Sequence, residues 1–471
     1  MLAPDQPGFG SYRQITLLSG PLILSHTSVM LMNIVDGLFL AHYAEESIAA
    51  IGPAGVLFWL FIGLFLGLTG YAGTFVAQYV GAGRPRRVGA AVWQALYVAL
   101  AAGILIAAIG PLAGPLFDAL GHDPAVAQLE AAYFRICCFG SIFFLASSAL
   151  SGFFAGRHDN VVLMVVHFIA GIINALLDWL LIFGVAGFPE MGISGAAVAS
   201  VAAHGVSTTL LALMFLHRSH RQQFGTWSDR SLDGPLFRRL CWYGFPNGVR
   251  MVVEIAAWAM FLVFVGRVST SGLAASNIAW RLNGLAFFPL VGLAIALSML
   301  VGQAQGAGRP DVSAAVTWRG LILAELWMLA AALLFVLVPR PLLAPFLSAE
   351  RLGPEQAALL TEMGVILLRF VAAYCLLDGL NIVLMAVLQG AGDTRWTLLA
   401  SGVMHGLFLA VLLVLDRLDA GLYRLWAAAM LFVMVLGLVW VWRFAGGAWR
   451  PMRVIEHAPP DLRDQALDWV S

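Results

Sequence analysis

Four acidic side chains lie inside long apolar stretches of this chain. Asp36 stands in the stretch from 17 to 41, and Asp178, Glu254 and Asp378 stand in later stretches. A carboxylate at membrane depth costs about 2.5–3.5 kcal/mol on insertion scales, so an acid in such a place usually has a function. A buried carboxylate can bind and release a proton or a hard cation, and the four acids indicate this chemistry.

Helical spacing places a polar partner beside two of these acids. Asn174 precedes Asp178 by four residues, and Arg250 precedes Glu254 by four, so each pair shares one face of a helix. We expect the positive charge of Arg250 one turn away to favour the charged carboxylate of Glu254 and so to make Glu254 a poor proton carrier. We therefore expect ion exchange to depend more on the acids in the first half of the chain than on those in the second half.

The composition shows what surrounds these acids. The chain has 471 residues, of which 61% are hydrophobic and 11% are charged, and its mean hydropathy is +0.88. A soluble domain carries about 25% charged residues, so the sequence predicts an all-α polytopic membrane protein. The net charge is zero and gives no support for a nucleic-acid partner. The chain shows neither a Ser–His pair nor an HExxH motif, so we expect it not to be an enzyme.

Twelve apolar segments are long enough to cross a bilayer, which takes about 20 residues. They cover residues 17–41, 53–79, 89–117, 130–155, 161–184, 193–217, 238–265, 274–302, 314–338, 361–389, 396–415 and 421–444. Several are longer than one bilayer thickness, which predicts tilted helices or ends that project from the membrane.

The arginines predict how the spans are oriented. Sixteen lie in the even-numbered loops and the two tails, and five lie in the odd-numbered loops. Because positive charge favours the cytoplasmic side, we expect both termini to be cytoplasmic.

An internal repeat organises the chain into two halves. The segment VAQYVGAGRPRRVGAAVWQAL at 76–96 aligns without a gap with VGQAQGAGRPDVSAAVTWRGL at 301–321, with ten of 21 positions identical and an offset of 225. Farther on, Gly156 and Asp159 match Gly390 and Asp393 at an offset of 234. A six-helix unit has been duplicated, and because six is even, both copies enter the membrane from the same side. Such halves have a pseudo-twofold axis along the membrane normal, and transporters built this way bind substrate near the midplane between them.

The repeat defines the expected domains. We expect an N-lobe at 1–217, a cytoplasmic linker at 218–237, a C-lobe at 238–445 and a cytoplasmic tail at 446–471.

Several motifs and their order along the chain resemble the MATE (multidrug and toxic compound extrusion) family, and within it the NorM-like branch. They are PLILSHTSVMLMNIVDGLFLAHY near the start, the paired QYVGAGRPRR and QAQGAGRP, GISGAAVAS and LQGAGDTR. The resemblance covers nearly the whole chain. It implies a MATE-type fold of the MOP superfamily, with twelve transmembrane helices in two pseudo-symmetric six-helix lobes that alternate between inward-open and outward-open V shapes.

The resemblance also implies roles for the polar residues. Asp36 looks like the family's N-lobe coupling acid, Asn174 and Asp178 match positions that join it in binding sodium or protons, and Ser200 stands where the family usually has Thr. Two carboxylates, an amide oxygen and a hydroxyl suit a hard cation, so these four residues would be metal ligands if the protein uses sodium. Two nearby carboxylates can instead share one proton.

The same resemblance implies a C-lobe site and a cargo cavity. Glu254 and Asp378 match acids of the NorM-like branch that bind the coupling cation or a cationic substrate. Aromatic faces attract cations, and five aromatic residues are candidates for the cavity wall: Phe39, Phe264, Trp280, Phe288 and Tyr374. Four histidines also lie within the spans, and we expect packing roles for them: His26, His167, His204 and His405.

The resemblance therefore implies a secondary active multidrug efflux antiporter. It would export organic cations or amphipathic drugs by alternating access in exchange for sodium or protons, with no other cofactor, as a monomer in the lipid of a bacterial inner membrane. The alternative is a lipid-linked saccharide flippase of the same superfamily, which tends to carry basic residues in its central cavity. The acids favour the antiporter, whereas Arg250, Arg281 and Arg369 within the spans keep the flippase open.

Overall fold

The computed structural model describes residues 4–347 and 353–456, and these residues form helices and loops without any strand. The helices of the first half of the chain are α1 (Tyr12–Tyr43), α2 (Glu45–Gly70), α3 (Ala72–Gly81), α4 (Arg86–Ile109), α5 (Ala113–Asp118), α6 (Pro124–Gly156), α7 (Asn160–Phe183), α8 (Ile193–Phe215) and α9 (Arg218–Phe224). Those of the second half are α10 (Gly234–Val268), α11 (Thr270–Gly306), α12 (Pro310–Leu337), α13 (Pro339–Leu343), α15 (Pro354–Ala391), α16 (Thr394–Arg417) and α17 (Leu422–Ala445).

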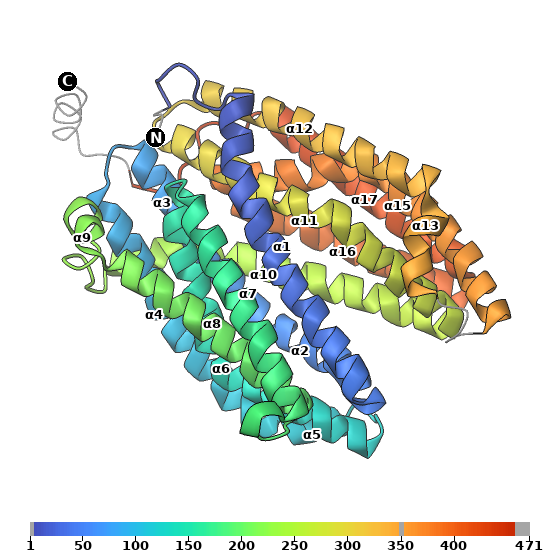
Figure 1. Ribbon diagram of the computed structural model, residues 1–471. Helices are drawn as coiled ribbons and strands as arrows, with labels where there is room; N and C mark the ends of the chain where they lie inside the picture. Colours follow the sequence, from blue (N-terminus) through green and yellow to red (C-terminus); the bar gives the residue numbers. More distant parts are fainter. Residues whose placement is uncertain (1–3, 348–352, 457–471) are drawn as a thin grey trace.

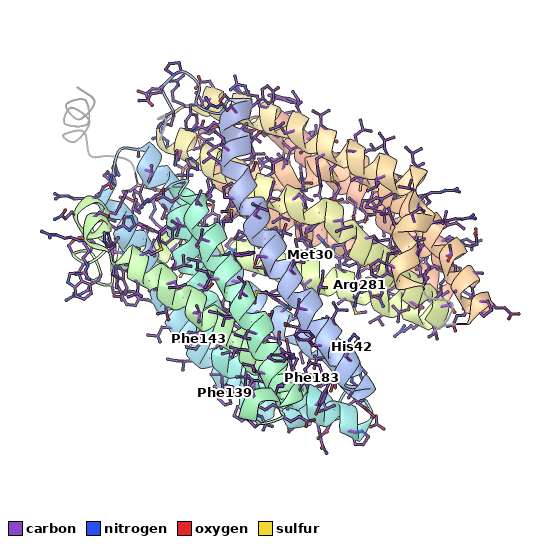
Figure 2. The ribbon with its side chains drawn as sticks, in the orientation of Figure 1. Met30, His42, Phe139, Phe143, Phe183 and Arg281 are labelled. Atoms are coloured by element: carbon purple, nitrogen blue, oxygen red, sulfur yellow. The ribbon has the colours of Figure 1, made fainter. Side chains whose placement is uncertain are left out.

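The twelve predicted spans are confirmed, since twelve helical segments of the described chain are long and apolar enough to cross a membrane. Many of them extend a few residues beyond the predicted ends because polar caps lie outside the apolar stretch. Asp233 accepts a hydrogen bond from the backbone N–H of Leu236 at 3.1 Å, which starts α10 at Gly234, inside the predicted linker. Large apolar side chains cover the outside of the bundle, and Phe139 and Phe143 of α6 point away from it, as Figure 2 shows.

The helices pack into two groups that follow the repeat. In the first group α6 contacts α2, α4 and α8, while α7 contacts α1 and α8; in the second, α15 contacts α11, α12 and α17, while α10 contacts α16. We call these groups the N-lobe and the C-lobe. Contacts between the lobes are made mainly by α1 with α11, α2 with α10 and α3 with α11. The lobes meet at the end where α3 contacts α11, and α5 and α13 lie far apart at the opposite end (Figure 1).

A reciprocal pair of glutamine contacts joins the lobes at the closed end. Gln78 donates from Nε2 to the carbonyl of Gly390 at 3.0 Å, and Gln303 donates to the carbonyl of Gly156 at 2.9 Å. The repeat relates Gln78 to Gln303 and Gly156 to Gly390, so each copy makes the same bond to the other. We call these two hydrogen bonds the glutamine clasp.

Two glycines let the backbones approach closely enough for the clasp to form. A Cβ atom added at Gly81 would overlap the backbone of Gln303, and one added at Gly306 would overlap the backbone of Gln78. The repeat relates these two glycines as well. Because the obstacles are backbone atoms of the other lobe, they cannot move aside as a flexible side chain would.

The segment after α17 crosses from the C-lobe to the N-lobe over the clasp. Val454 is fully buried, and its N–H donates to Oε1 of Gln78 at 2.8 Å. Glu456 accepts from the hydroxyl of Tyr79 at 2.7 Å and lies 3.5 Å from a guanidinium nitrogen of Arg84. This segment, residues 449–456, therefore ties both lobes together at the closed end.

We predict that Gly81→Ala prevents the lobes from closing at this end while leaving each lobe folded. The new methyl group meets backbone of the opposite lobe, and overpacking of this kind costs about 1–3 kcal/mol. Spin labels on the two lobes at the closed end should show a longer distance than in the wild type. Gly55→Ala is the matched control, since a Cβ at Gly55 meets nothing within 4 Å; an unchanged distance in Gly81→Ala would contradict the prediction.

Candidate functional site

Three helices of the N-lobe bring together the polar residues singled out in its sequence. Asp36 lies in α1, Asn174 and Asp178 lie in α7, and Ser200 lies in α8. The hydroxyl of Ser200 donates to Oδ2 of Asp36 at 3.1 Å. The carboxylate of Asp36 also faces the side chains of Asn174 and Asp178. We call these four residues the acid cluster.

The acid cluster is almost closed to solvent. Asp36 is 4% exposed, and Asn174 and Asp178 are 0% exposed. Oδ1 of Asp36 and all four side-chain N and O atoms of Asn174 and Asp178 lack a hydrogen-bond partner among the described residues. Leaving such groups unpaired is costly, and two carboxylates at close range repel each other. A proton or a hard cation held between them would relieve both costs, so the donor set fits either ion.

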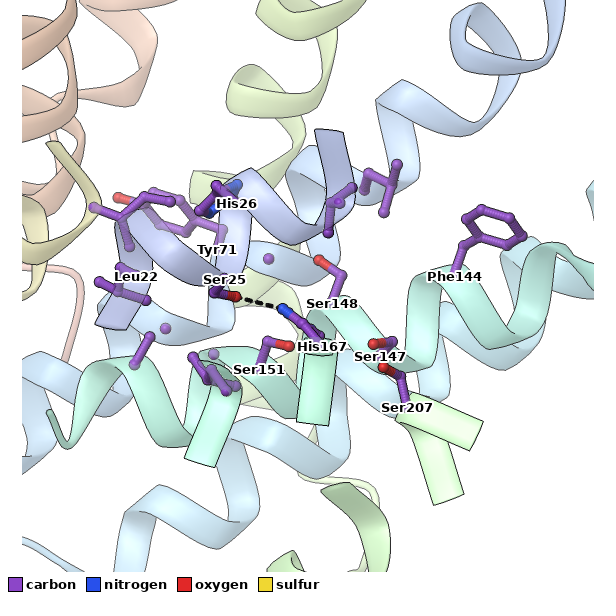
Figure 3. Close-up of a pocket in the computed structure, with 18 of the residues that line it drawn as sticks. Leu22, Ser25, His26, Tyr71, Phe144, Ser147, Ser148, Ser151, His167 and Ser207 are labelled. Atoms are coloured by element: carbon purple, nitrogen blue, oxygen red, sulfur yellow. Dashed lines mark hydrogen bonds between the residues drawn. The ribbon is translucent and has the colours of Figure 1, made fainter. Parts of the chain in front are cut away.

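A cavity of about 370 Å³ lies beside this cluster, mainly in the N-lobe. Its polar lining side chains carry mainly hydroxyl, amide and imidazole groups, as the close-up in Figure 3 illustrates. They are Ser25, His26, Tyr71, Thr74, Ser147, Ser148, Ser151, His167, His204, Ser207, Asn247, Ser298 and Gln389. The lining includes neither a carboxylate nor a guanidinium group.

Histidines from three helices give the cavity much of its polarity. Nδ1 of His167 on α7 is hydrogen-bonded to the hydroxyl of Ser25 on α1 at 2.5 Å, the dashed line of Figure 3. His204 on α8 stacks on Phe144 with ring centroids 3.8 Å apart. His26 on α1 completes the set. His204 has the packing role expected of it and His167 is hydrogen-bonded, and all three histidines also line one cavity.

Three apolar residues connect the cavity wall to the helices of the acid cluster. Met32, Ala170 and Ala203 form a small buried hydrophobic cluster and also line the cavity. Each lies about one helical turn from a member of the acid cluster, since Met32 precedes Asp36 by four residues and Ala170 precedes Asn174 by four. The cavity and the acid cluster are thus neighbours without sharing side chains.

The C-lobe acids lie in a different environment. Arg250, 8% exposed, donates to Oε2 of Glu254 at 2.6 Å, so the pair expected from the spacing is present. Asp378 accepts from Nδ2 of Asn381 at 3.0 Å, and Oδ1 of Asn381 accepts from the indole of Trp440 at 2.7 Å. Glu254 and Asp378 are close enough to interact electrostatically.

The structure adds an acid that our sequence analysis overlooked. Glu325 lies within the predicted span 314–338 and interacts electrostatically with Asp378. Its Oε1 is buried without a hydrogen-bond partner, and a Cβ at Gly379 would lie 2.5 Å from it. The signal was present in the sequence, since a single acid in an apolar stretch is the pattern that identified Asp36.

The aromatic residues proposed for a cavity wall lie elsewhere. Phe39 packs edge-to-face on Phe183 at 5.8 Å, and Trp280 packs on Trp258 at 4.6 Å. Phe264 and Tyr374 are buried in the C-lobe core, and Phe288 packs beside Phe287. The described cavity includes none of the five in its lining. Aromatic type alone did not identify the wall, because most aromatic side chains in a helical bundle serve packing.

The lining residues that the sequence analysis missed are mostly serines and amides. Ser147, Ser148 and Ser151 have helical spacing in an otherwise apolar stretch, which was the available signal for a polar face. Asn247 and Gln389 come from the C-lobe, and no local pattern places them beside N-lobe residues.

The comparisons with known proteins identify the family. The MatE family model matches residues 21–180 and 246–414, which together make up well over half of the chain. The chain belongs to the MatE family. Because this is a family of membrane transporters, the MatE protein described here is a transporter and not an enzyme.

Curated relatives of this MatE protein match over most of their length. A probable multidrug resistance protein NorM of Rhizobium meliloti is 28% identical over 456 residues, covering 95% of this chain and 95% of the relative. A protein of the same name from Thermotoga maritima is 24% identical over 388 residues, covering 81% of this chain and 80% of the relative.

Solved structures share the fold. A MOP superfamily transporter from Pyrococcus furiosus matches with a TM-score of 0.84 at 21% identity, over 93% of this chain and 96% of that chain. An outward-facing multidrug resistance MATE transporter of the same superfamily matches with a TM-score of 0.83 at 21% identity, over 93% of this chain and 96% of that chain.

We predict that Arg250 and Glu254 stabilise the C-lobe as a pair. Glu254→Gln leaves the buried guanidinium of Arg250 without its counter-charge, and the double variant Arg250→Gln/Glu254→Gln should recover part of the loss. Because the side chain of Glu254 is 39% exposed, solvent screens the pair, and we expect a coupling of about 1 kcal/mol. Thermal unfolding of Arg250→Gln, Glu254→Gln and the double variant in detergent measures this coupling; strictly additive losses would show that the pair contributes nothing.

Proposed function

We propose that this MatE protein is a secondary active multidrug efflux antiporter. It exports organic cations and amphipathic drugs in exchange for sodium ions or protons, by alternating access of a cavity between the lobes. The acid cluster carries this proposal, because four oxygen-bearing side chains meet beside a cavity at membrane depth and leave most of their polar atoms unpaired. The names of the NorM relatives support the class of cargo.

The arrangement of the lobes supports alternating access. With both termini in the cytoplasm, the clasp closes the cytoplasmic end and the lobes are open toward the outside. Inward opening then requires the clasp bonds of Gln78 and Gln303 to break. The arginine-rich loops that set the predicted orientation lie at this closed end, and Arg84 contacts the segment after α17.

The acid cluster is the better candidate for ion coupling. Protonation of Asp36 or Asp178, or a sodium ion held by Asp36, Asn174, Asp178 and Ser200, would change the contacts between α1 and α7. That change reaches the cavity through Met32 and Ala170, which lie one turn away. In the C-lobe Arg250 already compensates Glu254, so Glu254 and Asp378 are assigned a secondary role in cation or cargo binding.

The cavity chemistry favours drug export over the flipping of a lipid-linked saccharide. A flippase must bind a phosphate, which takes basic side chains, and the described cavity is lined by none. Arg250, one of the three arginines within the spans that kept the flippase open, donates a hydrogen bond to Glu254. We therefore place the protein in the lipid of a bacterial inner membrane as a monomer that handles small molecules and needs no cofactor beyond its coupling ion.

We predict that Asp36→Asn abolishes ion-driven export. The amide keeps the size of the side chain and its hydrogen bond from Ser200 but can neither carry a proton nor bind a cation as a carboxylate does. The measurement is export of a fluorescent organic cation from proteoliposomes under an imposed sodium gradient or an imposed pH gradient, and we expect a loss of at least about tenfold.

Asp311→Asn is the matched control, because Asp311 is an exposed acid that lies outside both acid sites, and this variant should retain most of the gradient-driven export. Export driven only by the sodium gradient would identify sodium as the ion that the acid cluster binds. Export driven only by the pH gradient would identify protons instead. Full coupled export by a correctly inserted Asp36→Asn protein would refute the role of the cluster. No export by the wild type under either gradient would refute the antiporter.

A further inference from the structure

Two arginines flank an exposed tryptophan on the outer surface of the C-lobe. Arg395, in the first turn of α16, lies over the ring of Trp242 on α10, with its guanidinium carbon 3.2 Å from the ring centroid. Arg238 precedes Trp242 by four residues, so it lies on the same face of α10. All three side chains are exposed. Nε of Arg239, the next residue, donates to the carbonyl of Val454 at 3.0 Å, which places this group at the closed end. We call Arg238, Trp242 and Arg395 the arginine–tryptophan patch.

The positive charge of the patch has no counter-charge among the described residues. Neither Arg238 nor Arg395 has a hydrogen-bond or ion-pair partner there. The acids nearest to them in sequence are engaged elsewhere, Asp233 with Arg87 at 2.9 Å and Asp393 with Arg443 at 2.7 Å. Arg395 also stands at the N-terminal end of α16, where the helix dipole disfavours a cation and favours an anion. The patch is therefore suited to bind an anion.

An apolar stripe continues from the patch along α16. Leu399, Val403 and Leu407 follow Arg395 at intervals of four residues, and each is between 54% and 65% exposed. Because α16 packs on α10, α15 and α17, all of the C-lobe, this exposed apolar face meets lipid chains. From Leu399 to Leu407 the helix rises about 12 Å, close to the hydrocarbon depth of about 15 Å in one leaflet. A cationic end joined to an apolar track of this length matches the shape of one phospholipid.

The repeat shows that the fold does not require this combination. The related positions of the N-lobe, at offsets of 225, 225 and 234, hold Arg13, Leu17 and Val161 in place of the three patch residues. These side chains are exposed as well. The same two helices are thus placed in the N-lobe with one arginine and no tryptophan, so helix packing alone does not explain Trp242 and Arg395.

We propose that the arginine–tryptophan patch binds the phosphate of an anionic phospholipid whose acyl chain lies along Leu399, Val403 and Leu407. The guanidinium groups of Arg238 and Arg395 donate hydrogen bonds to phosphate oxygens. The ring of Trp242 holds Arg395 by its negative face. A zwitterionic lipid binds more weakly, because its own cationic group is repelled by the two arginines. The inference depends on the membrane setting of the protein and not on the proposed export function.

The test measures lipid binding to the purified full-length protein by native mass spectrometry in detergent. The probe is phosphatidylglycerol, and phosphatidylcholine is the zwitterionic reference. Each arginine near a headgroup contributes about fivefold to anionic lipid binding, so Arg238→Gln/Arg395→Gln should weaken binding of the first phosphatidylglycerol roughly 10- to 30-fold. Phosphatidylcholine binding should stay unchanged.

Arg13→Gln/Arg86→Gln is the matched control. It removes two exposed arginines outside the patch, and therefore the same net charge, and should leave phosphatidylglycerol binding nearly unchanged. Equal losses in the patch and control variants would overturn the site, because net charge alone would then explain the binding. Equal binding of the two lipids by the wild type would overturn it too. Competition by an excess of soluble glycerol 3-phosphate would identify a free phosphate as the occupant and refute the lipid.

Two further measurements address the place and the geometry of binding. Phosphatidylglycerol with a photoactivatable diazirine in its acyl chain should crosslink to residues 399–407 of the wild type, and crosslinks found only in other helices would overturn the proposal. Trp242→Leu copies the residue at position 17 of the N-lobe and keeps both charges. It should weaken phosphatidylglycerol binding less than the double arginine variant does, since Arg395 loses only the ring that positions it. A larger loss in Trp242→Leu would refute the guanidinium groups as the main phosphate ligands.

Discussion

The structure depends on two lobes that bind each other through backbone groups at one end. The clasp of Gln78 and Gln303 ends on carbonyl groups, and Gly81 and Gly306 let the helices approach until no side chain lies between them. Contacts of this kind are either made or lost, because packed backbones do not slide over one another gradually. The molecule therefore suits two discrete arrangements, and the open V at the other end follows from closure at this one.

In the N-lobe the acidic side chains are separate from the cavity lining, which fits the high cost of placing charge in a membrane. Asp36 and Asp178 lie in one small cluster with Ser200 and Asn174, and the cavity next to them is lined by neither a carboxylate nor a guanidinium group. Met32, Ala170 and Ala203 line the cavity about one helical turn from this cluster. A change of ionisation on one side can thus alter helix packing on the other without exposing the acids to cargo.

Much of this could be predicted from the sequence, for physical reasons. The twelve spans follow from apolar length, and the two lobes follow from the repeat. The resemblance, and not the spacing, predicted that Asp36 and Ser200 act together. Spacing along one helix shows which residues share a face of that helix, but it does not show which other helix packs against that face. For the same reason the sequence did not indicate that three of the histidines line one cavity, nor which neighbours the five aromatic residues have.

The reciprocal clasp also bears on how the chain arose. Each residue of the clasp has a counterpart in the other copy of the repeat. Swapping the two copies turns the bond from Gln78 into the bond from Gln303. That is the requirement for an isologous interface between identical subunits. A single six-helix chain with this glutamine and these glycines would already have carried both halves of the contact. Its even number of spans would have let two copies be joined end to end without inverting the second. An ancestral homodimer could thus have closed on itself before gene fusion.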